Sequence, residues 1–195
     1  MTSKDLNEQY WNSQYLTNTT GWDMKQVSPP LKVYIDQLTS KDLHILIPGC
    51  GNSYEAAYLL EQGFTNITVI DIAPALVESL QKKFGNNPNI RILLGNFFEH
   101  EGAYDLVLEQ TFFCALNPTF RPAYAEKMHK LLKPNGKLAG VLFNREFVEG
   151  PPFGGSEAEY REIFVKGFHI KVLAPCYNSF IKREGTEVFM IFIRK

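Results

Sequence analysis

The feature that most constrains the fold is a series of short apolar runs that alternate with helix-like segments. The first three runs are Leu43–Pro48, Ile67–Ile72 and Ile90–Leu94, and apolar residues at helical spacing fill the intervals between them. Strands that are buried on both faces read as continuous apolar runs. The alternation therefore predicts a doubly wound α/β fold, in which helices cover both faces of a mostly parallel sheet.

The same pattern continues toward the C-terminus and predicts seven strands in total. The last two could pair in an antiparallel manner, so we expect a seven-stranded sheet with an antiparallel C-terminal strand. One helix start carries a local signal, because Asn52 and Glu55 have the spacing of a capping box. The further expected strands are Tyr104–Glu109, Lys137–Phe143, Phe168–Ala174 and Glu187–Ile193, and the expected helices are Ser53–Gln62, Ala73–Phe84, Arg121–Lys133 and Ser156–Lys166.

The length of 195 residues suits one domain. We predict a single domain over residues 1–195. Residues 1–40 would form an N-terminal helical flap, which is rich in aromatic residues, and residues 41–195 would form the α/β core.

Composition excludes several classes of protein. Lys and Arg number 20 against 21 Asp and Glu, a balance that argues against nucleic-acid binding through bulk positive charge. The longest apolar run, Val188–Ile193, is far shorter than the roughly 20 residues of a membrane helix, so we expect no membrane association. Three widely spaced cysteines and a polar N-terminus without a signal-peptide layout favour a cytoplasmic protein without a metal site. We expect a monomer or a weak dimer.

The loop after the first strand has features of an adenosine-cofactor site. Gly49 and Gly51 allow a tight turn and a close approach of the backbone to a ligand. Asp71 ends the second strand, where a carboxylate accepts hydrogen bonds from a ribose diol; it could also cap the helix that starts at Ala73. The dinucleotide pattern GxGxxG fails because Tyr54 stands in place of its third glycine, and no P-loop pattern is present. S-adenosylmethionine, which has no phosphates, fits this loop best.

Several motifs together resemble a known family. They are YWNSQYLTNTTGWD near the N-terminus, IPGCGNSYEAAYL, VIDIAP, GNFFEH, YDLVLEQTFFCALNPTFRPAYAEKMHKLLKPNG and the GPPF loop at Gly150–Phe153. The chain resembles the class I S-adenosylmethionine-dependent methyltransferases of the thiopurine S-methyltransferase-like family, nearest the branch that methylates halides, thiocyanate and thiols. The resemblance runs from about Tyr10 to Phe168 and implies a Rossmann-like fold.

The resemblance also implies the residues that bind the cofactor. Three aromatic positions would close over it, and at one of them Tyr15 replaces a tryptophan. Gly49 and Gly51 would line the methionine part, Asp71 would bind the ribose, and Gln110 would lie after the fourth strand at a position that varies among relatives. The implied cofactor-binding residues are Trp11, Tyr15, Trp22, Gly49, Gly51, Asp71, Asn96, Phe97 and Gln110.

The acceptor is expected to be a small molecule with a soft nucleophilic atom: a thiol, thiocyanate, bisulfide or a halide. Aromatic and proline-rich segments would enclose it in a small dehydrated cavity, and Arg145 could draw an anion in or be an ordinary solvated residue. No residue is assigned as a general base. Two alternatives stay open, an NAD-dependent reductase and a non-catalytic adenosine-cofactor-binding module. The predicted acceptor pocket comprises Phe113, Phe143, Arg145 and Phe153.

Overall fold

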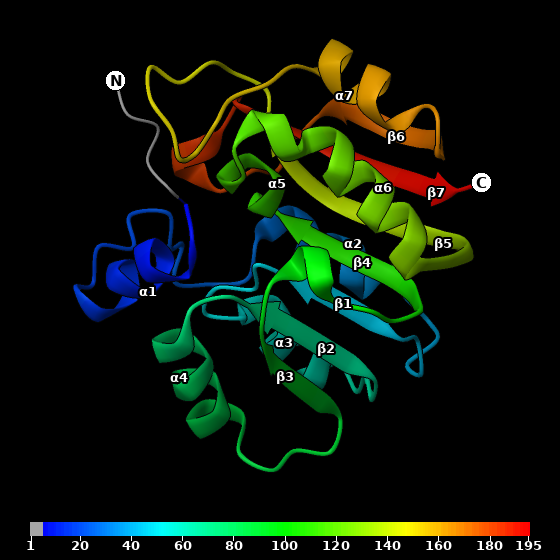
Figure 1. The fold of residues 1–195 in the computed structure, drawn as a ribbon. Helices are drawn as coiled ribbons and strands as arrows, with labels where there is room; N and C mark the ends of the chain where they lie inside the picture. The colour runs from blue at the N-terminus through cyan, green and yellow to red at the C-terminus, as the bar shows by residue number, and fades with distance from the viewer. Residues whose placement is uncertain (1–5) are drawn as a thin grey trace.

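The computed structural model describes residues 6–195, which form one seven-stranded sheet in the order β3-β2-β1-β4-β5-β7-β6 (Figure 1). The first five strands in this order run parallel, and β7 is antiparallel to both β5 and β6. The predicted fold class is therefore confirmed, including its antiparallel C-terminal strand. The strands are β1 (Ile45–Pro48), β2 (Ile67–Asp71), β3 (Ile90–Leu94), β4 (Tyr104–Gln110), β5 (Leu132–Phe143), β6 (Phe168–Pro175) and β7 (Glu187–Arg194).

Helices cover the two faces of this sheet and bury two separate cores. One core cluster contains side chains of α2, α3 and α4, and the other contains side chains of α5, α6 and α7. The central strands β1 and β2 are thus buried on both faces, as their apolar runs predict, whereas the edge strand β3 is only partly buried. The helices are α1 (Glu8–Leu16), α2 (Pro29–Asp36), α3 (Tyr54–Glu61), α4 (Pro74–Phe84), α5 (Phe112–Ala115), α6 (Arg121–Leu131) and α7 (Glu157–Phe164), with short 3₁₀ turns η1 (Phe97–Glu99), η2 (Pro118–Phe120) and η3 (Ile181–Arg183).

Two local predictions differ from the structure. The helix expected over Arg121–Lys133 ends at Leu131, because Leu132 already pairs with Tyr104 as the first residue of β5. The capping box at the start of α3 is wrong. The side chain of Asn52 donates to Asp23 at 2.9 Å, and Glu55 accepts a hydrogen bond from the backbone N–H of Ser28 at 2.8 Å. Both side chains bind the N-terminal segment, and that tertiary contact replaces the local cap.

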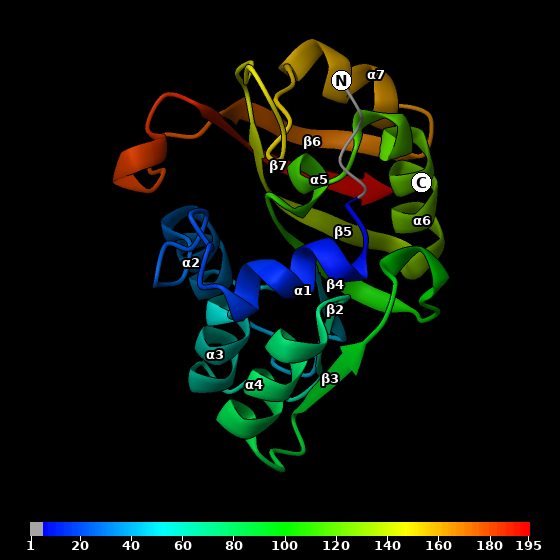
Figure 2. The same cartoon turned by 60° about the vertical axis from the view of Figure 1, so that its left-hand side comes forward.

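The two N-terminal helices lie in different surroundings. Helix α1 has no buried residue, and Figure 2 shows it in front of the central strands, above α4. Asn12 of α1 accepts a hydrogen bond from the N–H of Ala75 at 2.8 Å, which ties α1 to the start of α4. Helix α2 instead buries Leu31 and Ile35 completely in the core. Within the segment predicted as a flap, α1 therefore lies over the strand ends, whereas α2 is part of the core.

No helix within residues 6–195 has the length and apolar character needed to cross a membrane.

Candidate functional site

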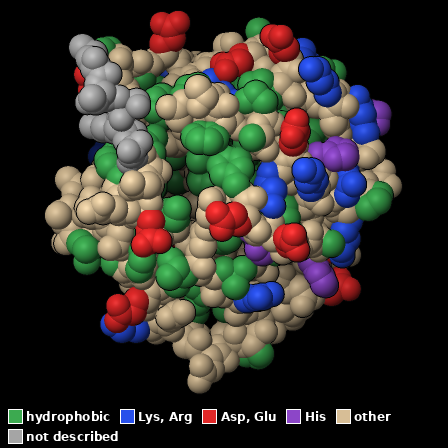
Figure 3. Space-filling model, viewed as in Figure 1, with side chains coloured by type: hydrophobic (Ala, Val, Ile, Leu, Met, Phe, Trp, Pro, Cys, Tyr) green, Lys and Arg blue, Asp and Glu red, His purple; other side chains and the backbone are tan. Residues whose placement is uncertain are grey.

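The sheet order places a crevice between β1 and β4. The connections from these two neighbours lead to helices on opposite faces, so their carboxyl ends form the switch point at which ligands of open α/β sheets bind. The residues that follow β1, β2 and β4 converge on this edge. Hydrophobic side chains gather over α5, next to a hollow between α5 and α1 in the space-filling view (Figure 3).

The loop after β1 requires its glycines. Gly49 and Gly51 both have positive φ, +53° and +50°, which L side chains rarely adopt. At Gly49 the ring of Phe112 lies so close that a Cβ atom would stand 2.1 Å from its nearest carbon. The turn therefore brings bare backbone to the strand ends and packs it against α5.

Asp71 is the carboxylate at the centre of this edge. It is only 8% exposed, and it accepts hydrogen bonds from Ala73 N–H at 3.0 Å and Gly51 N–H at 3.3 Å. Burial raises its pKa above the usual value, against these backbone hydrogen bonds, which lower it. The bond to Ala73 matches the capping alternative. A carboxylate accepts about four hydrogen bonds, however, so Asp71 still has capacity for the two hydroxyls of a ribose.

The three predicted aromatic positions meet at one place. The rings of Trp11 and Tyr15 both contact Trp22 edge-on, with centroid distances of 5.6 Å and 6.0 Å. Burial, with the nearby Asp71 carboxylate as the second cause, raises the pKa of Tyr15 far above its usual value and keeps its hydroxyl neutral. The structure thus brings these three residues together with Asp71 and the glycine loop.

Asn96 and Phe97 follow β3. Asn96 caps η1 through a hydrogen bond from Phe98 N–H at 3.0 Å, and its amide nitrogen donates to Glu99 at 3.2 Å. Phe97 is only 4% exposed and packs against Phe112 with a centroid distance of 5.3 Å. Both lie on the same edge, and Phe97 forms part of the wall rather than the surface.

Gln110 has the most informative environment of the predicted residues. It ends β4, and both polar atoms of its amide are buried with no hydrogen-bond partner within the described residues. An unsatisfied buried donor or acceptor costs about 1–3 kcal/mol. Such a group at a strand end is suited to a ligand that supplies the missing partners. With Asp71 and the glycine loop, Gln110 makes this edge fit an adenosine cofactor that carries a polar amino-acid part.

The predicted acceptor residues separate into three environments. Phe113 is fully buried among α6 and α7 and belongs to the core. Phe143 is 7% exposed and Phe153 is half-buried, and both are hydrogen-bonded through their backbone N–H groups to Cys114. Arg145 is exposed, with its guanidinium 4.7 Å from the ring centroid of Phe147. The structure therefore brings Phe143 and Phe153 together at α5 and places Arg145 outside.

Sequence reasoning missed Arg183. Its guanidinium lies 5.1 Å from the ring centroid of Phe143, donates to the carbonyl of Trp22 at 2.9 Å and pairs with the buried Glu187 at 3.3 Å. Its side chain is only 12% exposed. A basic residue between two predicted strands gives no local signal, because its position depends on β7 pairing with β5.

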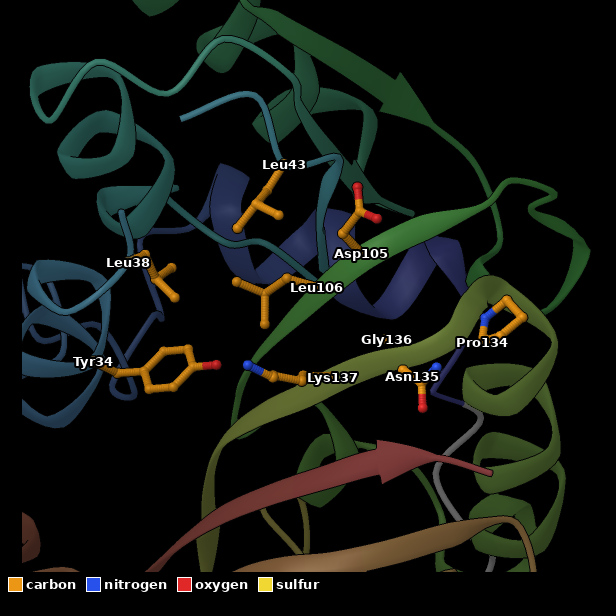
Figure 4. A pocket seen from close by; sticks show the side chains of 9 residues that line it. All are labelled: Tyr34, Leu38, Leu43, Asp105, Leu106, Pro134, Asn135, Gly136 and Lys137. Atoms are coloured by element: carbon orange, nitrogen blue, oxygen red, sulfur yellow. The ribbon is translucent and has the colours of Figure 1, made fainter. Parts of the chain in front are cut away.

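The opposite edge of the sheet holds a cavity of about 240 Å³ (Figure 4). Asp105 in its wall accepts hydrogen bonds from His44 N–H and from Lys133 Nζ, both at 2.9 Å. The hydroxyl of Tyr34 is buried with no partner within the described residues, and the side chain of Lys137 points toward it (Figure 4). This cavity lies at the amino ends of β4 and β5, away from the predicted site residues.

Among residues 6–195, no three side chains of His, Cys, Asp or Glu gather closely enough to hold a metal ion.

Comparison with known proteins agrees with this geometry. The family model described as thiopurine S-methyltransferase (TPMT) matches residues 6–189. A probable thiol methyltransferase 2 of Arabidopsis thaliana is 32% identical, over 91% of this chain and 81% of its own. Thiocyanate methyltransferase 1 of the same plant is 25% identical, over 94% and 84% of the two chains.

Among solved structures, a 1,6-didemethyltoxoflavin-N1-methyltransferase of Burkholderia thailandensis with bound S-adenosylhomocysteine has a similar fold. Its TM-score is 0.77 at 19% sequence identity, and the match covers 96% of this chain and 87% of that one.

Proposed function

Because this chain belongs to the thiopurine S-methyltransferase family, we propose that it methylates a small, soft nucleophile: a thiol, thiocyanate, bisulfide or a halide. It is an S-adenosylmethionine-dependent methyltransferase, and its membership of this family removes the NAD-dependent reductase as an alternative. The cofactor supplies a methyl group already activated on a positively charged sulfur. The chain itself has to bind, align and dehydrate the two reactants.

The cofactor would lie along the carboxyl edge of β1, β2 and β4. Asp71 would accept hydrogen bonds from the ribose hydroxyls, and Gln110 would bind polar groups of the methionine part. Gly49 and Gly51 would let the backbone approach that part closely. Asn96 and Phe97 would lie beside the adenine, and Trp11, Tyr15 and Trp22 would cover the ligand from α1 and the segment that follows it.

The acceptor would bind between Phe143, Phe153 and Arg183. The observation that carries this assignment is the guanidinium of Arg183, which is largely buried and stacks on the ring of Phe143. Arg183 is paired on one side with Glu187. A guanidinium has five N–H donors, so it keeps donors for an anion, and the lower local dielectric constant of the wall strengthens that attraction. Arg183, rather than the exposed Arg145, would therefore attract an anionic acceptor into the pocket. The two plant relatives, which are named for thiols and thiocyanate, support the same class of acceptor.

The proposed pocket needs no proton transfer for acceptors that are already ionised. When an anion attacks a positively charged methyl donor, charge is lost in the transition state, so excluding water accelerates the reaction. Alignment in a closed site contributes several kcal/mol more. A thiol, with an ordinary pKa of about 8.5, first has to lose its proton, and it would react faster as the pH rises.

A turnover screen tests this proposal. Iodide, thiocyanate, bisulfide, small thiols and thiopurines are each incubated with S-adenosylmethionine, and release of S-adenosylhomocysteine is measured. We expect turnover with at least one of the soft anions, and its loss by tenfold or more in Arg183→Met, which keeps much of the length and removes the charge. Arg145→Met, which removes the same charge outside the pocket, is the matched control and should stay close to wild type.

The proposal is wrong if none of these small nucleophiles is methylated while a protein or RNA is. Binding of S-adenosylhomocysteine without any turnover would favour the non-catalytic cofactor-binding module instead.

A further inference from the structure

Glu109 is a buried carboxylate for which the proposed methyl transfer has no direct use. It precedes Gln110 at the end of β4 and is fully buried. One of its oxygens accepts a hydrogen bond from Phe113 N–H at 3.1 Å, and the other accepts one from the hydroxyl of Tyr124. Burying a carboxylate costs free energy unless hydrogen bonds compensate. The hydrogen bonds from Phe113 and Tyr124 provide that compensation, and in turn they tie α5 and α6 to the end of β4.

The titratable groups around Glu109 come from three helices. Tyr124 on α6 is its direct partner, Cys114 on α5 is close to it, and Arg121 on α6 and Tyr160 on α7 lie close to Cys114. Burial raises the pKa of Glu109 to about 7, and its hydrogen bonds from Tyr124 and the α5 backbone oppose that rise. The polar anchor of α5 is therefore one carboxylate and one tyrosine, enclosed in apolar packing.

Helix α5 depends on this anchor. It has only four residues, too few for a helix to be stable through its own hydrogen bonds. Thr111, which precedes it, has a φ of +56°, a strained conformation for a β-branched residue. A single strained turn keeps one position only where its surroundings impose it. The hydrogen bond from Phe113 N–H to Glu109 supplies such a contact at the first turn.

On one side, α5 contacts the predicted cofactor loop. The ring of Phe112 fills the space beside Gly49, and it also packs edge-on against Phe97 with a centroid distance of 5.3 Å. Any movement of α5 would therefore shift the wall against which the turn after β1 is packed.

On the other side, α5 holds the predicted acceptor segments. The carbonyl of Cys114 accepts a hydrogen bond from Phe153 N–H at 2.6 Å, and its sulfur accepts one from Phe143 N–H at 3.4 Å. The hydroxyl of Tyr160 donates to the carbonyl of Phe143. One short turn thus contacts both halves of the site.

We propose that Glu109 and Tyr124 are a positioning pair that fixes α5, and through α5 sets the cofactor loop at Gly49 relative to the acceptor segments at Phe143 and Phe153. The consequence for chemistry rests on the proposed function, whereas the anchoring itself does not. The pair touches neither reactant; it acts by keeping the two binding surfaces in register for an in-line transfer.

Hydrogen exchange tests the anchoring without any need for turnover. In Glu109→Gln, only one side-chain oxygen is left to accept. If it keeps Phe113 N–H, Tyr124 has to turn its hydroxyl and accept from the amide; otherwise Phe113 N–H faces a second donor. In either case the hydrogen bonds to an ionisable carboxyl group are replaced by weaker ones to a neutral amide. In Tyr124→Phe, the carboxylate loses its hydroxyl donor. We expect amides 112–115 and Phe153 to exchange at least tenfold faster in both variants. Combining the two changes should add less than a further twofold, because each already breaks the same contact.

The matched control is Tyr104→Phe, at the other end of β4. It makes the same chemical change to a buried tyrosine whose hydroxyl is hydrogen-bonded, here to His100 at 2.7 Å. It should leave exchange at α5 unchanged. Unchanged exchange at α5 in Glu109→Gln and Tyr124→Phe would overturn the proposal, and so would a rise of equal size in β1 and β2, which would indicate only a loss of global stability.

Kinetics then test the consequence for catalysis. With an acceptor that the wild-type enzyme methylates, Glu109→Gln and Tyr124→Phe should lower kcat about tenfold, while KM for acceptor and cofactor changes less than threefold. A purely structural role would lower the fraction of folded enzyme and leave kcat per cofactor-binding site unchanged, and that result would overturn the positioning role. If the wild-type protein methylates none of the acceptors, the proposed function fails, and the exchange experiment still decides the anchoring.

Discussion

The two edges of the sheet satisfy their polar groups in different ways. At the amino edge, Asp105 is partnered by a backbone N–H and by the ammonium group of Lys133. At the carboxyl edge, Asp71 and Glu109 are buried with neutral donors, and the amide of Gln110 has no partner within the described residues. At the amino edge the carboxylate is satisfied by the chain's own groups, and within residues 6–195 the unpartnered buried group of the cavity there is a single hydroxyl, that of Tyr34. At the carboxyl edge it is a whole amide, which can both donate to and accept from a ligand. Matched substitutions at the two edges test this difference.

The largest effect is expected from Asp71. Asp71→Ala should weaken binding of S-adenosylhomocysteine by about 2–4 kcal/mol, the loss of a charged acceptor for the ribose hydroxyls. Asp105→Ala removes a carboxylate that also accepts a backbone hydrogen bond, but at the other edge, and should leave the affinity within about twofold. Isothermal titration calorimetry on both variants gives the comparison. Equal losses of affinity in the two variants, or no loss in a folded Asp71→Ala, would show that Asp71 does not bind the cofactor.

Gly49 is expected to show the next largest effect. Gly49→Ala combines strain at positive φ with a clash against the ring of Phe112, and should destabilise the protein by about 2–3 kcal/mol and weaken cofactor binding more than tenfold. Gly63→Ala has the same backbone strain, with φ of +84°, but nothing lies within 4 Å of the new Cβ. It should cost about 1 kcal/mol and leave binding unchanged. Similar results for the two variants, by thermal unfolding and calorimetry, would show that the contact with Phe112 has no role.

A substitution of Gln110 should change stability and cofactor affinity in opposite directions, which sharpens the comparison. Gln110→Leu removes an unsatisfied buried amide, so it should stabilise the ligand-free protein by about 1 kcal/mol while weakening cofactor binding about tenfold. Tyr34→Phe removes the unpartnered hydroxyl at the amino edge and should stabilise the protein without any loss of binding. A Gln110→Leu variant that binds the cofactor as tightly as wild type would contradict the assignment.

The last comparison concerns the pH dependence of stability, which also differs between the two edges. Because the folded pKa of Glu109 is raised from 4.5 to about 7, the folded state binds more protons between these values, and this group's contribution to stability falls as pH rises through that window. At Asp105, burial raises the pKa, but hydrogen bonds from Lys133 and His44 outweigh it and lower the pKa overall. Its contribution is therefore lost only as pH falls below about 4.

Denaturant unfolding from pH 5 to 8 measures the first of these contributions. Stability of Glu109→Gln should fall less over this range than that of wild type, and Asp105→Asn should follow the wild-type slope. Parallel curves for wild type and Glu109→Gln would mean that Glu109 keeps an ordinary pKa.

Much of the fold could be predicted because its signals are local. Most of the residues in the parallel strands are apolar, so the sequence predicts the second and fourth strands over Ile67–Ile72 and Tyr104–Glu109, each within one residue of the observed end, and the positions of Asp71 and Gln110 at the strand ends follow from it. Gly49 and Gly51 are likewise local, since only the turn after β1 determines their φ.

The rest depends on contacts between segments that are distant in the sequence. Asn52 and Glu55 have a capping spacing, yet they bind Asp23 and Ser28, which no local pattern reveals. Arg183 reaches Phe143 only because β7 pairs with β5. Glu109 gave a signal of its own, because a carboxylate inside a run that predicts a buried strand is unusual. Its partner Tyr124 lies on α6, however, so the pair is recognised only in the three-dimensional structure.

The place of β7 in the sheet also has a consequence for the order in which the protein assembles. β7 follows β6 in the chain but lies between β5 and β6. During synthesis, the first five strands of the sheet can pair as they emerge, whereas β6 has no neighbour to join until the residues of β7 have been made. The proposed acceptor side of the site, where Arg183 in the connection from β6 to β7 meets Phe143, would therefore be completed last. A nascent chain would have its cofactor edge in place before it could hold an acceptor.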